Sequence, residues 1–212
     1  YKRQADEWLL AEPQLEVFVD RIKRIFRRSA PIEQRLASAE PVFLDLLLRD
    51  GWLPREFQRG DEASGMGGGI GTWLLYRSAE RDLSLFALVV DPGSETPVHD
   101  HLAWGLVGLY RGRQREAVFR RQAGTPAVEL AEERELERGA IYRLIPPEGD
   151  IHAVSTTSAE ASISIYLLGS DIGCIWRHRY DVHAGTVHDF RSGYSNRACD
   201  DAPRPSQRHE AC

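Results

Sequence analysis

Short apolar segments over residues 72–190 constrain the fold of this chain more than any other feature. Each segment is of strand length and rich in β-branched or aromatic residues, and turn-forming pairs such as Pro92-Gly93, Arg111-Gly112 and Arg138-Gly139 separate them. Many short strands broken by turns are typical of a β-sandwich or barrel, so we predict a mainly β fold. The predicted strands are Thr72–Tyr76, Leu83–Val90, Trp104–Tyr110, Gln114–Arg121, Ala127–Glu132, Ala140–Ile145, Ile151–Thr156, Ala161–Leu168 and Cys174–Val182.

The first fifty residues have a different pattern, in which apolar residues return every three or four positions. The clearest series is Trp8, Leu15, Phe18, Ile22 and Phe26. This spacing predicts an N-terminal helical segment, followed by a short second helix and a third over Pro41–Leu48, with Pro41 in the first turn. We therefore divide the chain into a helical segment over 1–58 packed on a barrel, a β domain over 59–198 and a polar tail over 199–212.

Net charge, apolar run length and cysteine content limit the classes of partner and the cellular location that we expect. The net charge is −5, which gives no electrostatic reason to expect nucleic acid. No apolar run approaches the roughly 20 residues that span a bilayer. Cys174, Cys199 and Cys212 form an odd set without CxxC spacing, so we expect reduced thiols and a cytoplasmic location. We expect small-molecule partners, no membrane and no nucleic acid, in a monomer or a dimer.

Three histidines are the candidate metal ligands. His99 and His101 are two positions apart, so in a strand both side chains face the same way, and Asp100 faces the other way as a structural residue. Taken alone, such a pair is as readily a surface or core feature as a metal site. His152 follows a Pro/Gly turn over residues 147–151 at the start of a predicted strand, which could supply the third imidazole. Imidazole suits iron, copper, nickel and zinc.

The turns around these histidines carry a family resemblance. Gly93, His99-x-His101 and Gly112 resemble the first cupin motif, and Pro147-x-Gly149-x-x-His152 resembles the second. This resemblance implies a double-stranded β-helix, or jelly roll. The common cupin motif also has a glutamate ligand four residues after the second histidine, where this chain has Gly105. The resemblance therefore implies a site of three neutral imidazoles.

A three-histidine cupin site resembles that of the thiol dioxygenases, the family of cysteine dioxygenase and the bacterial 3-mercaptopropionate dioxygenases. The resemblance extends over Asp50–Pro54, Pro97–His101, Trp104–Gly108, Ser162–Ile165, Gly169–Gly173 and Ser192–Asn196. It implies Fe(II) as the cofactor, a small thiol and O2 as the substrates, and a sulfinic acid as the product. The metal ligands implied are His99, His101 and His152.

This chain departs from that family at the positions that contact the substrate. The Ser-His-Tyr set of the family corresponds here to Ser164, Tyr166 and Leu168. Ser164 and Tyr166 are the candidate catalytic residues, and Tyr166 either reaches the site or packs within its strand. The residue that grips the substrate carboxylate corresponds to Thr72. An arginine after the Ile-Gly turn of the mercaptopropionate-type relatives matches Arg177, which is either a carboxylate ligand or a surface residue.

These departures point away from cysteine itself and suggest a thiol that is larger or differently charged, for which aromatic residues are available. Trp73, Tyr76 and Trp104 are candidate substrate-binding residues, because a cationic group such as a trimethylammonium binds against aromatic faces. Ergothioneine is a thiol of that kind. Two alternatives remain open: a cupin metalloenzyme that dioxygenates a non-thiol substrate, which the loss of the family tyrosine allows, and a non-catalytic cupin that binds a small molecule.

Overall fold

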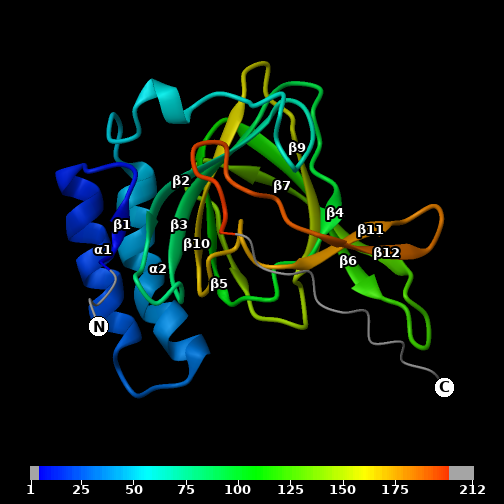
Figure 1. Ribbon diagram of the computed structural model, residues 1–212, viewed down its shortest axis with the longest axis horizontal. Coiled ribbons are helices and arrows are strands. Elements are labelled where there is room, and N and C mark those ends of the chain that lie inside the picture. The colour runs from blue at the N-terminus through cyan, green and yellow to red at the C-terminus, as the bar shows by residue number, and fades with distance from the viewer. Residues whose placement is uncertain (1–4, 201–212) are drawn as a thin grey trace.

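The computed structural model describes residues 5–200 and consists of two facing antiparallel sheets with two helices on one side (Figure 1). The first sheet has the strand order β1-β2-β3-β10-β5-β8 and the second the order β12-β11-β4-β9-β6-β7. The elements are β1 (Glu7–Trp8), α1 (Pro13–Phe26), α2 (Ile32–Leu48), the 3-10 helix η1 (Arg55–Phe57), β2 (Ile70–Arg77), β3 (Ser84–Val90), β4 (Val98–His99), β5 (Gly105–Arg111), β6 (Arg113–Arg121), β7 (Val128–Glu137), β8 (Ile141–Leu144), β9 (Ile151–Thr156), β10 (Ser162–Leu168), β11 (Arg177–Asp181) and β12 (Thr186–Phe190).

The chain passes repeatedly from one sheet to the other. β3 lies in the first sheet, β4 in the second, β5 in the first and β6 and β7 in the second; β8, β9 and β10 continue the alternation. Strands that alternate between two facing sheets wind as a double-stranded β-helix, the arrangement of a jelly roll. The prediction of a mainly β, cupin-type jelly roll with N-terminal helices is therefore confirmed.

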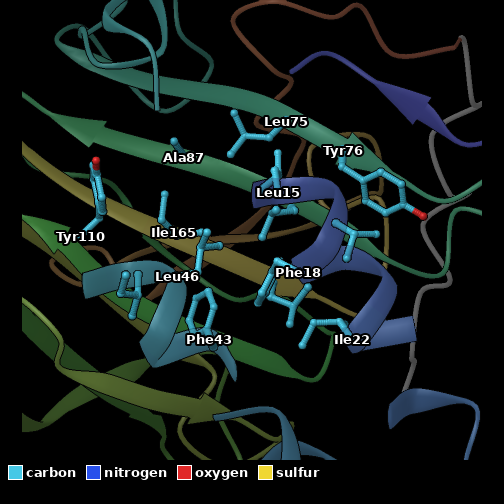
Figure 2. Packing of buried hydrophobic residues seen from close by; sticks show 14 of the residues in the cluster. Leu15, Phe18, Ile22, Phe43, Leu46, Leu75, Tyr76, Ala87, Tyr110 and Ile165 are labelled. Carbon is cyan, nitrogen blue, oxygen red and sulfur yellow. The ribbon is translucent and has the colours of Figure 1, made fainter. Parts of the chain in front are cut away.

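Strand β10 shows how both faces of the first sheet are covered. All seven of its residues are buried, which is the pattern of a strand with packing partners on both sides. Ile163, Ile165 and Leu167 belong to the core beneath the helices, whereas Tyr166 and Leu168 belong to the core between the sheets. Figure 2 shows Leu15, Phe18 and Ile22 of α1 and Phe43 and Leu46 of α2 against the outer face of this sheet. Only the inner face can therefore contribute to a site inside the barrel.

Several predicted boundaries were wrong. Trp8 lies in β1, where it pairs with Tyr76, and not in a helix. Pro41 lies inside the single helix α2 and starts no new helix. The helix continues through it because Ala39, Val42 and Phe43 are buried, and this packing outweighs the lost N–H bond. The edge strands β1 and β12 were not predicted.

The prediction of reduced thiols was wrong for two cysteines, because Cys174 and Cys199 form a disulfide across 25 residues of sequence. The segment after β12 runs back along β2, where Ser195 N donates to Thr72 O over 2.7 Å, and this path brings Cys199 to Cys174. The cytoplasmic location therefore stays a prediction, without the support of free thiols. Cys212 lies outside the described residues, as does the predicted tail beyond Asp200. Over residues 5–200, no helix combines the length and apolarity that crossing a bilayer requires.

Candidate metal centre

Three buried histidines converge inside the barrel. His99 ends β4, and its cross-strand partner in β9 is His152; His101 follows two residues after His99. The exposed fractions of His99, His101 and His152 are 3%, 2% and 0%, and their ring centroids lie 4.8–5.0 Å apart. One ligand nitrogen from each lies within 4.8 Å of the others. The sequence therefore identified a group of side chains that the structure brings together.

The position of His101 differs from the expected strand geometry, since β4 ends at His99. Its place is set by Asp150, whose carboxylate accepts hydrogen bonds from His101 N over 3.1 Å and from Leu102 N over 2.9 Å. Leu102 adopts a left-handed conformation with φ of 56°, which turns the chain away after the histidine. A buried carboxylate from the second cupin-like turn thus directs the second ligand.

Each histidine uses Nδ1 for a hydrogen bond to an oxygen that can only accept. His99 Nδ1 lies 2.8 Å from Pro97 O, His101 Nδ1 lies 3.2 Å from Asp150 Oδ1, and His152 Nδ1 lies 2.7 Å from Glu116 Oε1. A carbonyl or carboxylate partner fixes the proton on Nδ1 and leaves the Nε2 lone pair for a metal. His152 Nε2 is buried and has no hydrogen-bond partner. These residues fit a divalent transition metal bound through three Nε2 atoms.

The surroundings keep two of these imidazoles neutral. Burial, together with the charge of Arg177, holds the pKa of His99 well below its ordinary value. Burial also lowers the pKa of His101 to about 4, against the opposing effect of Asp150. Neutral imidazole is the form that binds metal, so these two histidines are ready to bind at pH 7.

Glu116 was not anticipated from the sequence. It lies on β6 with an exposed fraction of 1%, and its second oxygen forms an ion pair of 2.9 Å with Arg134 Nε. Burial acts to raise its pKa, but the hydrogen bond with His152 and the charges of His152 and Arg134 outweigh this and lower it. The Tyr142 hydroxyl lies 3.4 Å from the same Nδ1 of His152. The sequence shows only a carboxylate within the predicted strand Gln114–Arg121, in an unbroken polar run over residues 113–116.

Packing explains why position 105 carries no carboxylate. A Cβ built on Gly105 would lie 2.4 Å from Leu167 O and 2.3 Å from Leu168 Cδ2. The first of these contacts is with the backbone of the neighbouring strand β10, which cannot rotate away. The common cupin glutamate does not fit here, and the donor set is limited to the three imidazoles.

A small cavity adjoins two of the histidines and contains Arg177. Its interior volume is about 10 Å³, which is room for roughly one water. Arg177 Nη1 donates to Asp100 O and Nη2 to Ser192 Oγ, both over 2.8 Å, while Nε has no partner. Burial lowers the pKa of Arg177 to about 10, so it stays charged at pH 7. The cavity is lined by Met66, Thr72, Phe86, Leu88, His99, His101, Tyr166, Ile172 and Arg177.

No carboxylate among residues 5–200 forms an ion pair with Arg177. Over residues 5–200, none of the ion pairs within 4.0 Å includes its guanidinium. Asp100, the nearest acidic residue in sequence to the metal ligands, is bound instead by Tyr180 Oη over 2.8 Å and by His178 Nδ1 over 2.7 Å. This agrees with the predicted structural role of Asp100. The guanidinium is thus a buried cation at the cavity, and its Nε–H can still donate a hydrogen bond to an anion.

Two further predicted site residues line this cavity, and one does not. Thr72 Oγ1 is buried without a partner. Tyr166 stacks on Phe86 at 4.8 Å, and its ring centroid lies 6.0 Å from that of His101. Its hydroxyl makes no well-aligned hydrogen bond with a described residue, and burial raises its pKa. Ser164 lies on the same strand but donates to Gln114 Oε1 over 2.5 Å, and it does not line the cavity.

The predicted aromatic residues lie on the opposite side of the first sheet. Trp73 Nε1 donates to Arg59 O, and the Tyr76 hydroxyl donates to Asp6. Trp104 stacks on Phe26 of α1 with ring centroids 4.5 Å apart. Trp73 and Tyr76 belong to the core beneath the helices, and Trp104 packs against it. Trp73 faces away from its neighbour Thr72 because adjacent residues of a strand face opposite sides, and the bulge between Leu74 and Tyr76 interrupts the alternation before Tyr76. The structure therefore contradicts their assignment as substrate-binding residues.

No family model matches the chain. Among solved structures it is similar to Peruvianin-I, a cysteine peptidase from Thevetia peruviana latex, with 20% identity over 42% of this chain and 52% of that one and a TM-score of 0.36. The chain thus spans about half the length of Peruvianin-I. A Klebsiella pneumoniae protein with a double-stranded β-helix domain is 15% identical over 55% of this chain and 81% of that one, with a TM-score of 0.41. The cupin domain of Schizosaccharomyces pombe Cnp3 gives 14% over 57% and 74%, also at 0.41. The fold itself rests on the strand order, which makes this chain a cupin-type jelly roll around a buried three-histidine site.

Proposed function

We propose that this protein is a mononuclear iron(II) thiol dioxygenase whose substrate is a small thiol that carries a carboxylate. The observation that carries the proposal is the combination of three converging imidazoles, no carboxylate ligand and, in the adjoining cavity, a buried arginine that has no ion-pair partner among residues 5–200. Neutral ligands leave the positive charge of a divalent metal to be offset by a thiolate, the form in which thiols bind metals.

The reaction proposed is RSH + O2 → RSO2⁻ + H⁺, in which sulfur is oxidised, O2 is reduced and no further reductant is consumed. Bound iron would supply the activation of thiolate and O2 and the transfer of both oxygens to sulfur. In this proposal Arg177 binds the substrate carboxylate, and charge-assisted hydrogen bonds from a guanidinium are strong and directional. Thr72 and Tyr166 offer hydroxyls to the same cavity, and Tyr166 donates because its raised pKa keeps it protonated.

The cavity favours a small anionic thiol over ergothioneine. Its interior has room for roughly one water before any rearrangement. The aromatic residues that suggested a cationic substrate face the helices, and the charged group in the cavity is a guanidinium, which repels a trimethylammonium. The shorter 3-mercaptopropionate carries the thiol and carboxylate without a cationic group.

Oxygen uptake by the iron(II)-loaded protein tests the proposal. We expect uptake with 3-mercaptopropionate, a product heavier by two oxygens, weaker activity with cysteine and least with cysteamine and ergothioneine. His152→Ala should abolish uptake together with stoichiometric metal binding. Arg177→Gln should raise KM for the carboxylated thiols, whereas its matched control Arg179→Gln should not, because Arg179 is exposed and outside the cavity.

Two other results would replace the proposal. A different cupin dioxygenase would be identified if the protein binds stoichiometric iron, takes up oxygen with none of the thiols and oxidises a non-thiol compound instead. Stoichiometric iron without any oxygen uptake, combined with saturable binding of a small molecule, would identify a binding protein.

A further inference from the structure

The negative charge that Gly105 excludes from the metal ligands is present one hydrogen bond further out. Glu116 Oε1 lies 2.7 Å from His152 Nδ1, and its side chain is 1% exposed. The pairing of β6 with β9 sets this contact, with Glu116 opposite Val154 and Val118 opposite His152. A carboxylate that accepts from the outer nitrogen of a ligating histidine makes the inner nitrogen a stronger donor.

The three ligands differ in the charge of the group behind them. Behind His99 is the neutral carbonyl of Pro97. Behind His101 is Asp150 at 3.2 Å, and its carboxylate is shared with the backbone N–H groups of His101 and Leu102. Behind His152 is Glu116 at the shorter distance of 2.7 Å. His152 is thus the ligand through which a full negative charge acts most directly.

Arg134 limits that charge from the other side. It lies opposite Glu116 in the pairing of β6 with β7, with Nε 2.9 Å from Glu116 Oε2 and a side chain that is 34% exposed. Its guanidinium also lies over the ring of Tyr142 at 5.1 Å. Arg134, Glu116 and His152 thus form a row that runs from the surface to the metal position, in which a positive charge lies outside a negative one.

We propose that Glu116 is a positioning residue that tunes the metal through His152, in place of the carboxylate ligand that Gly105 excludes, and that Arg134 sets how much of its charge reaches the metal. The inference rests on the proposed metal centre but not on the thiol chemistry. Removing the charge of Glu116 makes His152 Nε2 a weaker donor and favours the lower oxidation state of the metal, Fe(II) over Fe(III). Removing the charge of Arg134 does the reverse.

Two substitutions with opposite expected effects test this inference without any thiol. Glu116→Gln keeps the size and the acceptor oxygen but removes the charge. It should weaken Co(II) binding by roughly 10- to 100-fold and raise the Fe(III)/Fe(II) midpoint potential. Arg134→Gln should lower the potential and bind Co(II) at least as tightly as the wild type. Glu133→Gln is the matched control, since Glu133 is 49% exposed and paired with Arg115, and it should change neither quantity.

The outcomes separate this inference from the proposed function. If Glu116→Gln matches Glu133→Gln in affinity and potential, or if Glu116→Gln and Arg134→Gln shift the potential in the same direction, the inference is overturned. A wild-type protein that binds neither Co(II) nor Fe(II) overturns the proposed function as well. If Glu116→Gln does not fold, Arg134→Gln and Glu116→Asp still test the inference. Arg134→Gln should lower the midpoint potential, and Glu116→Asp, which keeps the charge, should leave it near the wild-type value.

Discussion

Position 105 offers a direct test of why this site has three histidines and no carboxylate. Replacing Gly105 with alanine adds one methyl group in the strand next to β10. That methyl group would lie 2.4 Å from Leu167 O and 3.1 Å from Leu168 Cα, in addition to its contact with Leu168 Cδ2. Two of these three atoms belong to the backbone, so relief requires β5 and β10 to separate.

The expected cost follows from the contact distances. Ordinary carbon contacts lie near 3.5–4.0 Å, so the strands must move apart by about 1 Å at a position where both are fully buried. Overpacking of this kind costs about 1–3 kcal/mol, which is a large share of a typical unfolding free energy of about 5–15 kcal/mol. Gly105→Glu should cost more, because it adds a longer side chain and a buried carboxylate.

Urea unfolding and metal titration measure both effects. We expect Gly105→Ala to unfold at lower urea with unchanged Co(II) stoichiometry, and Gly105→Glu to fold poorly or not at all. Gly68→Ala is the matched control, because its added methyl meets only the mobile carboxylate end of Glu62 at 2.9 Å, and we expect a change within about 0.5 kcal/mol. A Gly105→Glu protein of wild-type stability that binds metal more tightly would refute the steric reasoning.

Three further predictions concern the disulfide, the metal and the pH. Reduction of Cys174–Cys199, which closes 25 residues, should lower the unfolding free energy by up to about 3.5 kcal/mol from loop entropy, and thiol titration of the unfolded protein should find two more thiols after reduction than before it. Metal at a hundred times its Kd should raise the unfolding free energy by about 2.7 kcal/mol, an increment that His152→Ala should lose. The hydrogen bond to Asp100 raises the pKa of His178 above its ordinary 6.5, so this contact stabilises the fold below that pH and the benefit is lost as the pH rises through the raised value. The stability difference between the wild type and His178→Gln should therefore shrink from pH 6 to pH 9, and a constant difference would contradict the assignment.

The metal ligands could be predicted from the sequence because each lies in a short motif with its own turn. Two histidines at a spacing of two, and one after a Pro/Gly turn, are local patterns, and the topology then brings them together. Glu116 could not be predicted in this way. Its contact with His152 spans 36 residues and depends on the register between β6 and β9, which no local pattern in the sequence specifies.

The aromatic residues were misassigned for a related reason. Strand β2 is buried on both faces, so its sequence does not reveal which residues face the barrel and which face the helices. Thr72 faces the cavity, while Trp73 faces the helices. One residue of difference in the assumed register exchanges the two faces. A bulge between Leu74 and Tyr76 shifts the alternation again, and no residue pattern in the strand predicts this bulge.

The charges of Glu116, Asp150, Arg134 and Arg177 rank the thiols that the cavity should accept. Glu116 and Asp150 contribute two negative charges, and Arg134 and Arg177 contribute two positive charges, so these four groups sum to zero. A divalent metal raises the sum to +2, and a substrate with a thiolate and a carboxylate returns it to zero. An ammonium group on cysteine leaves +1, and cysteamine, with a thiolate and an ammonium, leaves +2. Since buried net charge is costly, we expect kcat/KM to fall from 3-mercaptopropionate through cysteine to cysteamine. In Arg177→Gln each sum falls by one, to −1 with 3-mercaptopropionate and to zero with cysteine, so we expect the order of these two to reverse. A wild-type preference for cysteamine would show that charge balance does not select the substrate.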